Sequence, residues 1–283
     1  MNYHTHTKRC KHAGGSDEEY IESAIKSGFQ ELGFADHTPW PFDSSYTSSM
    51  RMDIEQLDDY VNHLQILKQK YVNQISIKIG LECEYFEEYI PWLRHIIEEY
   101  KVDYVIFGNH FSSNEQKNVG YGKMKTDETA LELYLDTAIK AIELKLFAYF
   151  AHPDIFIRGY GKFDDVCERI SRQICEKAKE YDLILEFNIS NYICEPDSKH
   201  YLYPCLDFWK IVSELGCRCI IGYAAHQPQV LEQQNGYLKA IAELEKIGIE
   251  IVDAVSYTHL ETQIQKQLLK CNLILLLHQD ITK

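Results

Sequence analysis

Two histidines near the start of the chain, His4 and His6, stand two residues apart in the stretch YHTHTKRC. In a β-strand, residues i and i+2 point to the same face, so a strand here would direct both imidazoles at one site. Imidazole is a common ligand of transition metals, which makes this spacing a candidate metal site. On its own the pattern is weak evidence, because many histidines are structural.

Further residues that can bind metals follow later apolar segments, each where a predicted strand ends. Any one of them alone is more often a structural residue. Six of the twelve histidines, however, fall at the same end of successive strands, and scattered structural histidines do not follow such a rule. The residues at the later strand ends are His37, Glu82, His110, His152, Glu186, Asn188 and His226.

The elements that would position these residues alternate along the chain. Amphipathic segments with helical spacing separate seven apolar segments, and this order is typical of a parallel α/β sheet. Seven such units predict a closed barrel, in which the carboxyl ends of the strands meet at one face, where active sites lie. The predicted strands are residues 2–5, 31–35, 75–81, 103–107, 147–151, 182–187 and 218–222.

The chain shows no linker or shift in composition, so a single domain over residues 1–283 is expected. The stretch after about residue 255 is predicted to be helical. His63 and His95 lie within charged helical segments and are predicted to be solvated. His200 and His278 have no context that suggests chemistry, and His259 stays open.

The composition excludes several classes of protein. With 29 basic and 43 acidic residues the formal net charge is −14, which opposes binding to nucleic acids and anionic membranes. The longest apolar stretch near the end, LILLL at residues 273–277, is far too short to span a membrane, and no signal peptide is expected. Nine cysteines without a paired framework predict reduced thiols in a cytoplasmic protein.

The predicted cluster is too rich in ligands for one ion, because a tetrahedral site takes about four protein ligands. Two or three divalent ions of Zn, Fe or Mn sharing a carboxylate would suit this set. Such centres clamp the oxygens of a phosphoester and generate a hydroxide from bound water. A protein nucleophile is then unnecessary, and the chain has no GxSxG sequence.

Six stretches in order resemble the PHP (polymerase and histidinol phosphatase) family, in its branch of monofunctional histidinol-phosphate phosphatases. The resemblance runs from residue 3 to about residue 230. The segment RMDIEQLDDYVNHL favours the phosphatase branch over a polymerase domain. The six stretches are YHTHTKRCKHAGG, GFADHTPW, GLECEY, GNHF, AHPDIF and GYAAHQP.

The resemblance implies a distorted seven-stranded (β/α)7, TIM-like barrel with a trinuclear metal centre. It implies hydrolysis of L-histidinol phosphate to L-histidinol and phosphate, a step of histidine biosynthesis, with His226 and Arg158 as catalytic residues. Arg158, six residues past His152 on the same predicted loop, would bind the phosphate, since a guanidinium matches phosphate with two hydrogen bonds. The implied ligand groups are His4, His6 and Glu82; Glu82, His110 and His152; and His12, His37 and His226.

One position departs from the family pattern. Ala224 stands where the family usually has an aspartate that binds the first ion, and a methyl group binds no metal. Three readings therefore stay open: a histidinol phosphatase, a phosphatase for another small phosphomonoester, and a weakened protein that binds metal or phosphate. A plain surface arginine is the alternative interpretation of Arg158, and Arg9 and Lys11 are weaker candidates for phosphate binding.

Overall fold

The structure, a computed structural model, describes residues 1–42, 45–111, 114–116, 120–122, 125–194 and 202–252. Its strands are β1 (Glu31–His37), β2 (Ser76–Cys83), β3 (Tyr104–Gly108), β4 (Tyr149–Ala151), β5 (Ile184–Asn188) and β6 (Cys219–Gly222). Its α-helices are α1 (Asp17–Lys26), α2 (Leu57–Lys70), α3 (Ile90–Tyr100), α4 (Glu128–Glu143), α5 (Ile155–Tyr160), α6 (Asp165–Glu180), α7 (Ser190–Cys194), α8 (Leu206–Glu214) and α9 (Gln234–Lys246).

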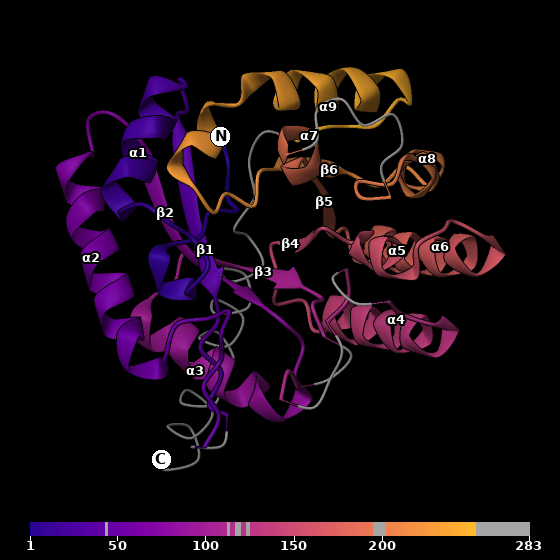
Figure 1. The fold of residues 1–283 in the computed structure, drawn as a ribbon, viewed down its shortest axis with the longest axis horizontal. Coiled ribbons are helices and arrows are strands. Elements are labelled where there is room, and N and C mark those ends of the chain that lie inside the picture. Colours follow the sequence, from indigo (N-terminus) through magenta and orange to yellow (C-terminus); the bar gives the residue numbers. More distant parts are fainter. Residues whose placement is uncertain (43–44, 112–113, 117–119, 123–124, 195–201, 253–283) are drawn as a thin grey trace, which may run out of the picture.

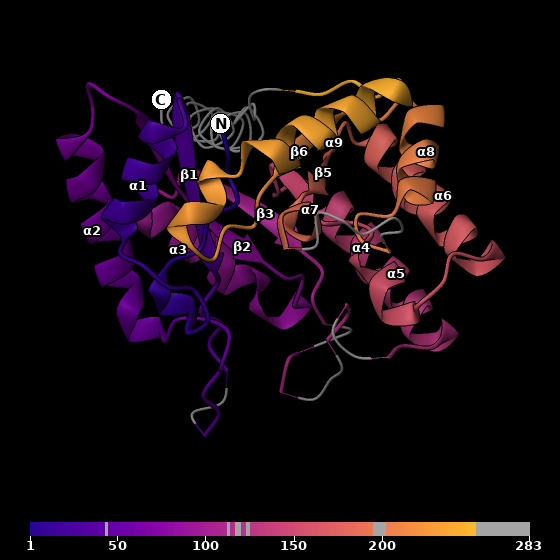
Figure 2. The same cartoon turned by 45° about the horizontal axis from the view of Figure 1, so that its top comes forward.

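The strands form one parallel sheet in the order β1-β2-β3-β4-β5-β6, so every strand pairs with its neighbours along the chain. In both views the strands lie in the middle and the long helices lie around them (Figures 1 and 2). This arrangement confirms the predicted α/β barrel. Six predicted strands match β1 to β6 to within two residues at each end.

The seventh predicted strand, residues 2–5, is present as isolated bridges instead of a continuous strand. Its residues pair with β1 on one side (Asn2 with Leu32) and with Ala225 beyond β6 on the other, which joins the two edges of the sheet. The carbonyls of Asn2 and Thr5, three residues apart, accept hydrogen bonds from two amides of β1 that are two residues apart. One extra residue is thus accommodated, as in a β-bulge, and this breaks the regular strand.

Side chains alternate between the two faces of each strand and build two separate cores. One set, such as Phe34 and Phe107, packs against the surrounding helices. The other set faces the barrel interior and forms a buried apolar cluster, here named the inner plug: Tyr3, Ala35, Tyr104, Ile106, Tyr149, Ala151, Ile184 and Ile220. The inner faces of the strands therefore carry apolar residues first and the polar strand-end residues above them.

The predicted helical segments are found as α1, α2, α3, α4, α6, α8 and α9. Helix α1 begins at Ser16, whose side chain accepts a hydrogen bond from the Glu19 amide while the Glu19 carboxylate accepts one from the Ser16 amide. The short helices α5 and α7 have no predicted counterpart. In the described part of the chain no helix is both long and apolar enough to cross a membrane.

The helix expected after residue 255 lies outside the described residues, as do His200, His259 and His278. The extent of the domain over residues 1–283 therefore stays a prediction.

Candidate metal centre

All eight predicted ligands come together at the carboxyl ends of the strands. Neighbouring imidazole rings form a continuous group, with ring centroids 4.1 Å apart between His6 and His226 and 4.5 Å apart between His6 and His37. Further ring contacts of 5.0 to 5.6 Å connect His4, His6, His37, His110 and His152, and the His12 ring lies 4.6 Å from the His226 ring at a tilt of 34°. The prediction that one barrel face gathers these side chains is confirmed.

Glu82 lies in the middle of this group, 1% exposed on strand β2. Its carboxylate oxygens approach ring nitrogens of five histidines at distances from 2.8 to 3.6 Å: His4, His6, His37, His110 and His152. Gly108 on the next strand makes room, because a Cβ there would come 2.4 Å from the Glu82 carboxylate. A carboxylate placed among five imidazoles is the natural bridge between metal ions.

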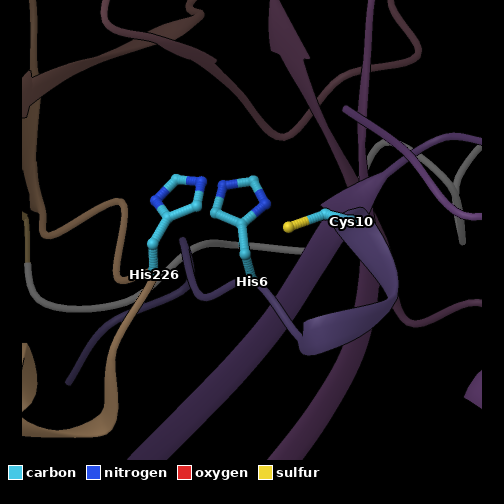
Figure 3. Close-up of side chains that lie close together, drawn as sticks. All are labelled: His6, Cys10 and His226. Atoms are coloured by element: carbon cyan, nitrogen blue, oxygen red, sulfur yellow. The ribbon is translucent and has the colours of Figure 1, made fainter. Parts of the chain in front are cut away.

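His12 and His226 each have one ring nitrogen fixed by the backbone. The Nδ1 atoms hydrogen-bond to the carbonyls of Cys10 (2.7 Å) and Ala224 (2.8 Å), which leaves Nε2 as the ligand atom. Donor atoms of His12, His37 and His226 lie within 4.8 Å of one another, and so do those of His6, Cys10 and His226. Figure 3 shows the His6 ring between the His226 ring and the Cys10 sulfur. Cys10 was not predicted at this site.

Three buried carboxylates that were not among the predicted ligands stand behind the histidines. Glu84 lies 2.9 Å from Nδ1 of His110, Glu186 lies 2.7 Å from Nδ1 of His4, and Asp36 lies 3.6 Å from Nδ1 of His6. In each case Nε2 faces Glu82. A carboxylate on the outer nitrogen fixes the ring and makes the inner nitrogen a better metal ligand.

The sequence held a signal for these partners. Glu84 follows Glu82 by two residues, and Asp36 precedes His37 directly. Glu186 stands at the end of a predicted strand. What the sequence lacked was the identity of each partner histidine.

Arg51 supports Glu84 from the segment that leads into α2. Its guanidinium, 1% exposed, donates to Glu84 and Glu115 and to the Thr38 carbonyl. Trp40 donates a further hydrogen bond of 2.7 Å to Glu84. Burial raises the pKa of the Glu84 carboxyl, but Arg51 and His110 together outweigh it through their charges and hydrogen bonds and lower that pKa to about 2. Glu84 is therefore anionic where it meets His110.

The charges in the cluster suit a cation. Burial raises the pKa of Glu82, but His110, His4 and His37 outweigh it and hold this pKa well below its usual range. Burial lowers the pKa of His226 to about 2, which keeps this ring neutral. Within the described residues, both ring nitrogens of His6 and Nε2 of His226 are buried without a hydrogen-bond partner. Buried polar atoms are rarely left so, and these atoms fit a transition-metal site.

The three cationic residues predicted to bind phosphate differ in their burial and in their partners. Arg158 is exposed and lies on helix α5, not on a loop as predicted. Arg9 is buried and bound to Asp17 and Asp59, so it is not available to a phosphate. Lys11 pairs with Asp53.

Of the two histidines predicted to be solvated, His95 is exposed as expected. The prediction for His63 is wrong in part, because its Nδ1 hydrogen-bonds to buried Asp17 at 2.8 Å.

Comparisons with known proteins agree with this geometry. Residues 2–190 match the PHP domain family. A Deinococcus radiodurans protein named "Probable histidinol-phosphatase" is 26% identical over 255 residues, which are 87% of this chain and 92% of that protein. The histidinol-phosphatase of Bacillus subtilis is 32% identical over 115 residues, 38% of this chain and 42% of that protein.

A solved structure shares the fold. The histidinol phosphate phosphatase of Lactococcus lactis, complexed with Zn, L-histidinol and phosphate, aligns with a TM-score of 0.71 at 20% identity. The alignment covers 90% of this chain and 96% of that chain. The family match spans well over half of the 283 residues. The chain is therefore a member of the PHP domain family.

Proposed function

We propose that this chain is a metal-dependent phosphomonoesterase that hydrolyses L-histidinol phosphate to L-histidinol and phosphate. The observation that carries the proposal is Glu82, buried and surrounded by five imidazoles at 2.8 to 3.6 Å. The names of the Deinococcus radiodurans and Bacillus subtilis relatives support the reaction, and the Lactococcus lactis complex supports the substrate.

The proposed metal ligands are the eight residues gathered at the strand ends, with Glu82 as the shared one. His12, His37 and His226 form one group, as the family resemblance implies. Around Glu82 the donors within 4.8 Å of one another are grouped differently from that expectation, with His4 beside His152 and His6 beside His37. We therefore propose two or three ions around Glu82 and leave their division among the other histidines to metal analysis.

When bound, the ions supply a hydroxide nucleophile from water and neutralise charge on the phosphate. The chain's own residues then have three tasks. The carboxylates behind the histidines hold the Nδ1 side of each ring, which aims Nε2 at the centre. Arg158, on the helix that follows His152, is proposed to hold the phosphate oxygens. His226 is proposed to act beside the reacting phosphate, from a ring fixed by the Ala224 carbonyl.

The test is hydrolysis of L-histidinol phosphate by protein loaded with Zn, Mn or Fe(II) and by the same protein after chelation. We expect phosphate release only from the loaded protein. A panel of other small phosphomonoesters at equal concentration tests the substrate. A loaded protein that releases no phosphate from any of them would refute the proposal.

Ala224 favours a second candidate, a weakened protein that binds metal and phosphate but turns over slowly. The residue brings no ligand to the centre, although its backbone lies beside His226. Binding of inorganic phosphate to the loaded protein, measured by calorimetry, together with slow or no phosphate release in the hydrolysis assay would support this second function. A cytoplasmic location stays a prediction.

A further inference from the structure

Glu186, on strand β5, is fully buried and is not among the proposed metal ligands. We propose that it is a positioning residue of the metal centre, which holds His4 and His152 in the orientations that aim both imidazoles at Glu82. This inference rests on the proposed function of the site as a metal centre.

Three donors use both oxygens of the Glu186 carboxylate. Nδ1 of His4 lies 2.7 Å from Oε1, while the His152 amide (3.0 Å) and Nδ2 of Asn188 (3.1 Å) donate to Oε2. Because both oxygens have partners within the protein, the carboxylate serves to orient its neighbours. His4 lies 182 residues away in the chain and His152 lies 34 residues away, so Glu186 joins two distant strand ends.

The bond to His152 holds an uncommon backbone conformation. His152 has a φ of 38°, in the left-handed region that few residues other than glycine adopt. Its amide donates to Glu186, and its Nε2 lies 2.8 Å from Glu82. His152 is thus held at its amide by Glu186 and at its ring by Glu82, and Glu82 is the centre of the proposed metal site. Such strain persists where the surroundings hold it in place.

The fold also reserves space for this side chain. Gly222 on β6 pairs with Asn188 on β5, and a Cβ at Gly222 would come 1.8 Å from Oε1 of Glu186. On the inner face of β5, Glu186 follows Ile184 of the inner plug by two residues. Glu186 therefore borders the inner plug, both along its own strand and through its register partner Ile220 on β6.

The experiment compares zinc binding by the wild-type chain and by Glu186→Gln. An amide has one acceptor oxygen, so its NH2 group must face at least one of the three donors, while its volume leaves no cavity. We expect the dissociation constant of one zinc ion to rise about 10–100-fold, measured by competition with a chromophoric chelator. Far-ultraviolet circular dichroism should stay unchanged, and the ring nitrogen NMR shifts of His4 should change.

Asp154→Asn is the matched control, because it removes a buried carboxylate that lies two residues from His152. Oδ2 of Asp154 accepts hydrogen bonds from the Cys205 amide and the Trp209 indole, and Oδ1 has no hydrogen-bond partner within the described residues. An asparagine can keep both bonds through its oxygen. We expect its zinc affinity to equal that of the wild type, and a loss as large as that of Glu186→Gln would overturn the inference.

Other outcomes separate the inference from the function on which it rests. Wild-type protein that takes up no zinc would overturn the proposed function and this inference with it. Normal wild-type binding with unchanged affinity in Glu186→Gln would overturn the inference alone. Should that variant fail to fold, Glu186→Asp keeps the charge but is too short to reach both histidines, and unchanged zinc affinity there would overturn the inference.

Discussion

The inner faces of the same strands behave differently at their two levels. In the inner plug, the Tyr104 hydroxyl donates to the carbonyls of Tyr3 and Phe34 at 2.6 and 3.0 Å. The ring fits because Gly33 and Gly80 have no side chains, and a Cβ there would come 2.3 and 2.5 Å from Tyr104. The plug is thus closely packed with its hydroxyl satisfied.

Beyond the carboxyl ends of these strands lie buried polar atoms that lack hydrogen-bond partners in the described structure, including both ring nitrogens of His6 and Nε2 of His226. Nonglycine residues with positive φ also occur here, at His152 and Ala224. The inner plug therefore contributes to folding stability through packing, whereas the cluster of histidines and Glu82 above it, the upper level, is arranged to bind a cation. The following substitutions test this division, beginning with the largest expected effect.

Glu82→Gln should separate the two levels most clearly. It removes the shared anion of the metal site, so metal affinity should fall by more than the roughly 10–100-fold typical of losing an outer partner, and phosphatase activity should be lost. Elemental analysis after dialysis and phosphate release are the measurements. Glu31→Gln, at the opposite end of the barrel where Glu31 accepts from Ser76, is the control and should keep its metal. Full metal content in Glu82→Gln would contradict the ligand assignment.

Ala224→Asp should strengthen the upper level. Ala224 has a φ of 43°, and aspartate adopts this left-handed region more readily than alanine. A carboxylate there would add a ligand, so metal occupancy at limiting metal and kcat should both rise, by a factor of about 10 or more. Ala224→Asn has the same shape and backbone preference without the charge. Equal gains in both variants, or none, would show that the carboxylate is not what the site lacks.

Arg158→Ala tests the proposed phosphate contact of this arginine. Loss of a charge-assisted hydrogen bond costs about 1.5–3 kcal/mol, so KM for the phosphomonoester should rise more than tenfold. The melting temperature should stay unchanged, because the side chain is exposed. Arg169→Ala on α6, where the arginine pairs with Glu132, is the control. Kinetics identical to the wild type would make Arg158 a surface residue only.

Tyr104→Phe tests the plug and should have the smallest effect on function. Two buried carbonyls lose a donor, which lowers the free energy of unfolding by about 1–3 kcal/mol. Urea denaturation of the metal-free protein measures this loss. Metal content and KM should match those of the wild type, and a clear fall in metal affinity would show that the two levels are not independent.

The positions of the carboxylates that pair with histidines could be predicted from the sequence, but the pairs themselves could not. Seven of the eight proposed ligands could be predicted because strand ends converge in a parallel barrel, a rule that needs only local periodicity and chain order, whereas His12 came from the family resemblance alone. Glu84 and Glu186 were visible at strand ends, but their partners were not. Which histidine each one meets depends on the register between strands and on the bulge near Asn2 and Thr5, and neither leaves a local signal.

The sequence by itself determined the alternation of strands and helices, the eight residues that gather at the barrel face, and the family to which they belong. The tertiary structure alone decided that Arg9 and Arg51 are held by carboxylates and that Tyr104 closes the barrel interior over two glycines. The physical reason is how far apart in the chain the interacting residues lie. Side-chain periodicity is set by the backbone within a few residues, whereas ion pairs and close packing depend on residues far apart in the chain.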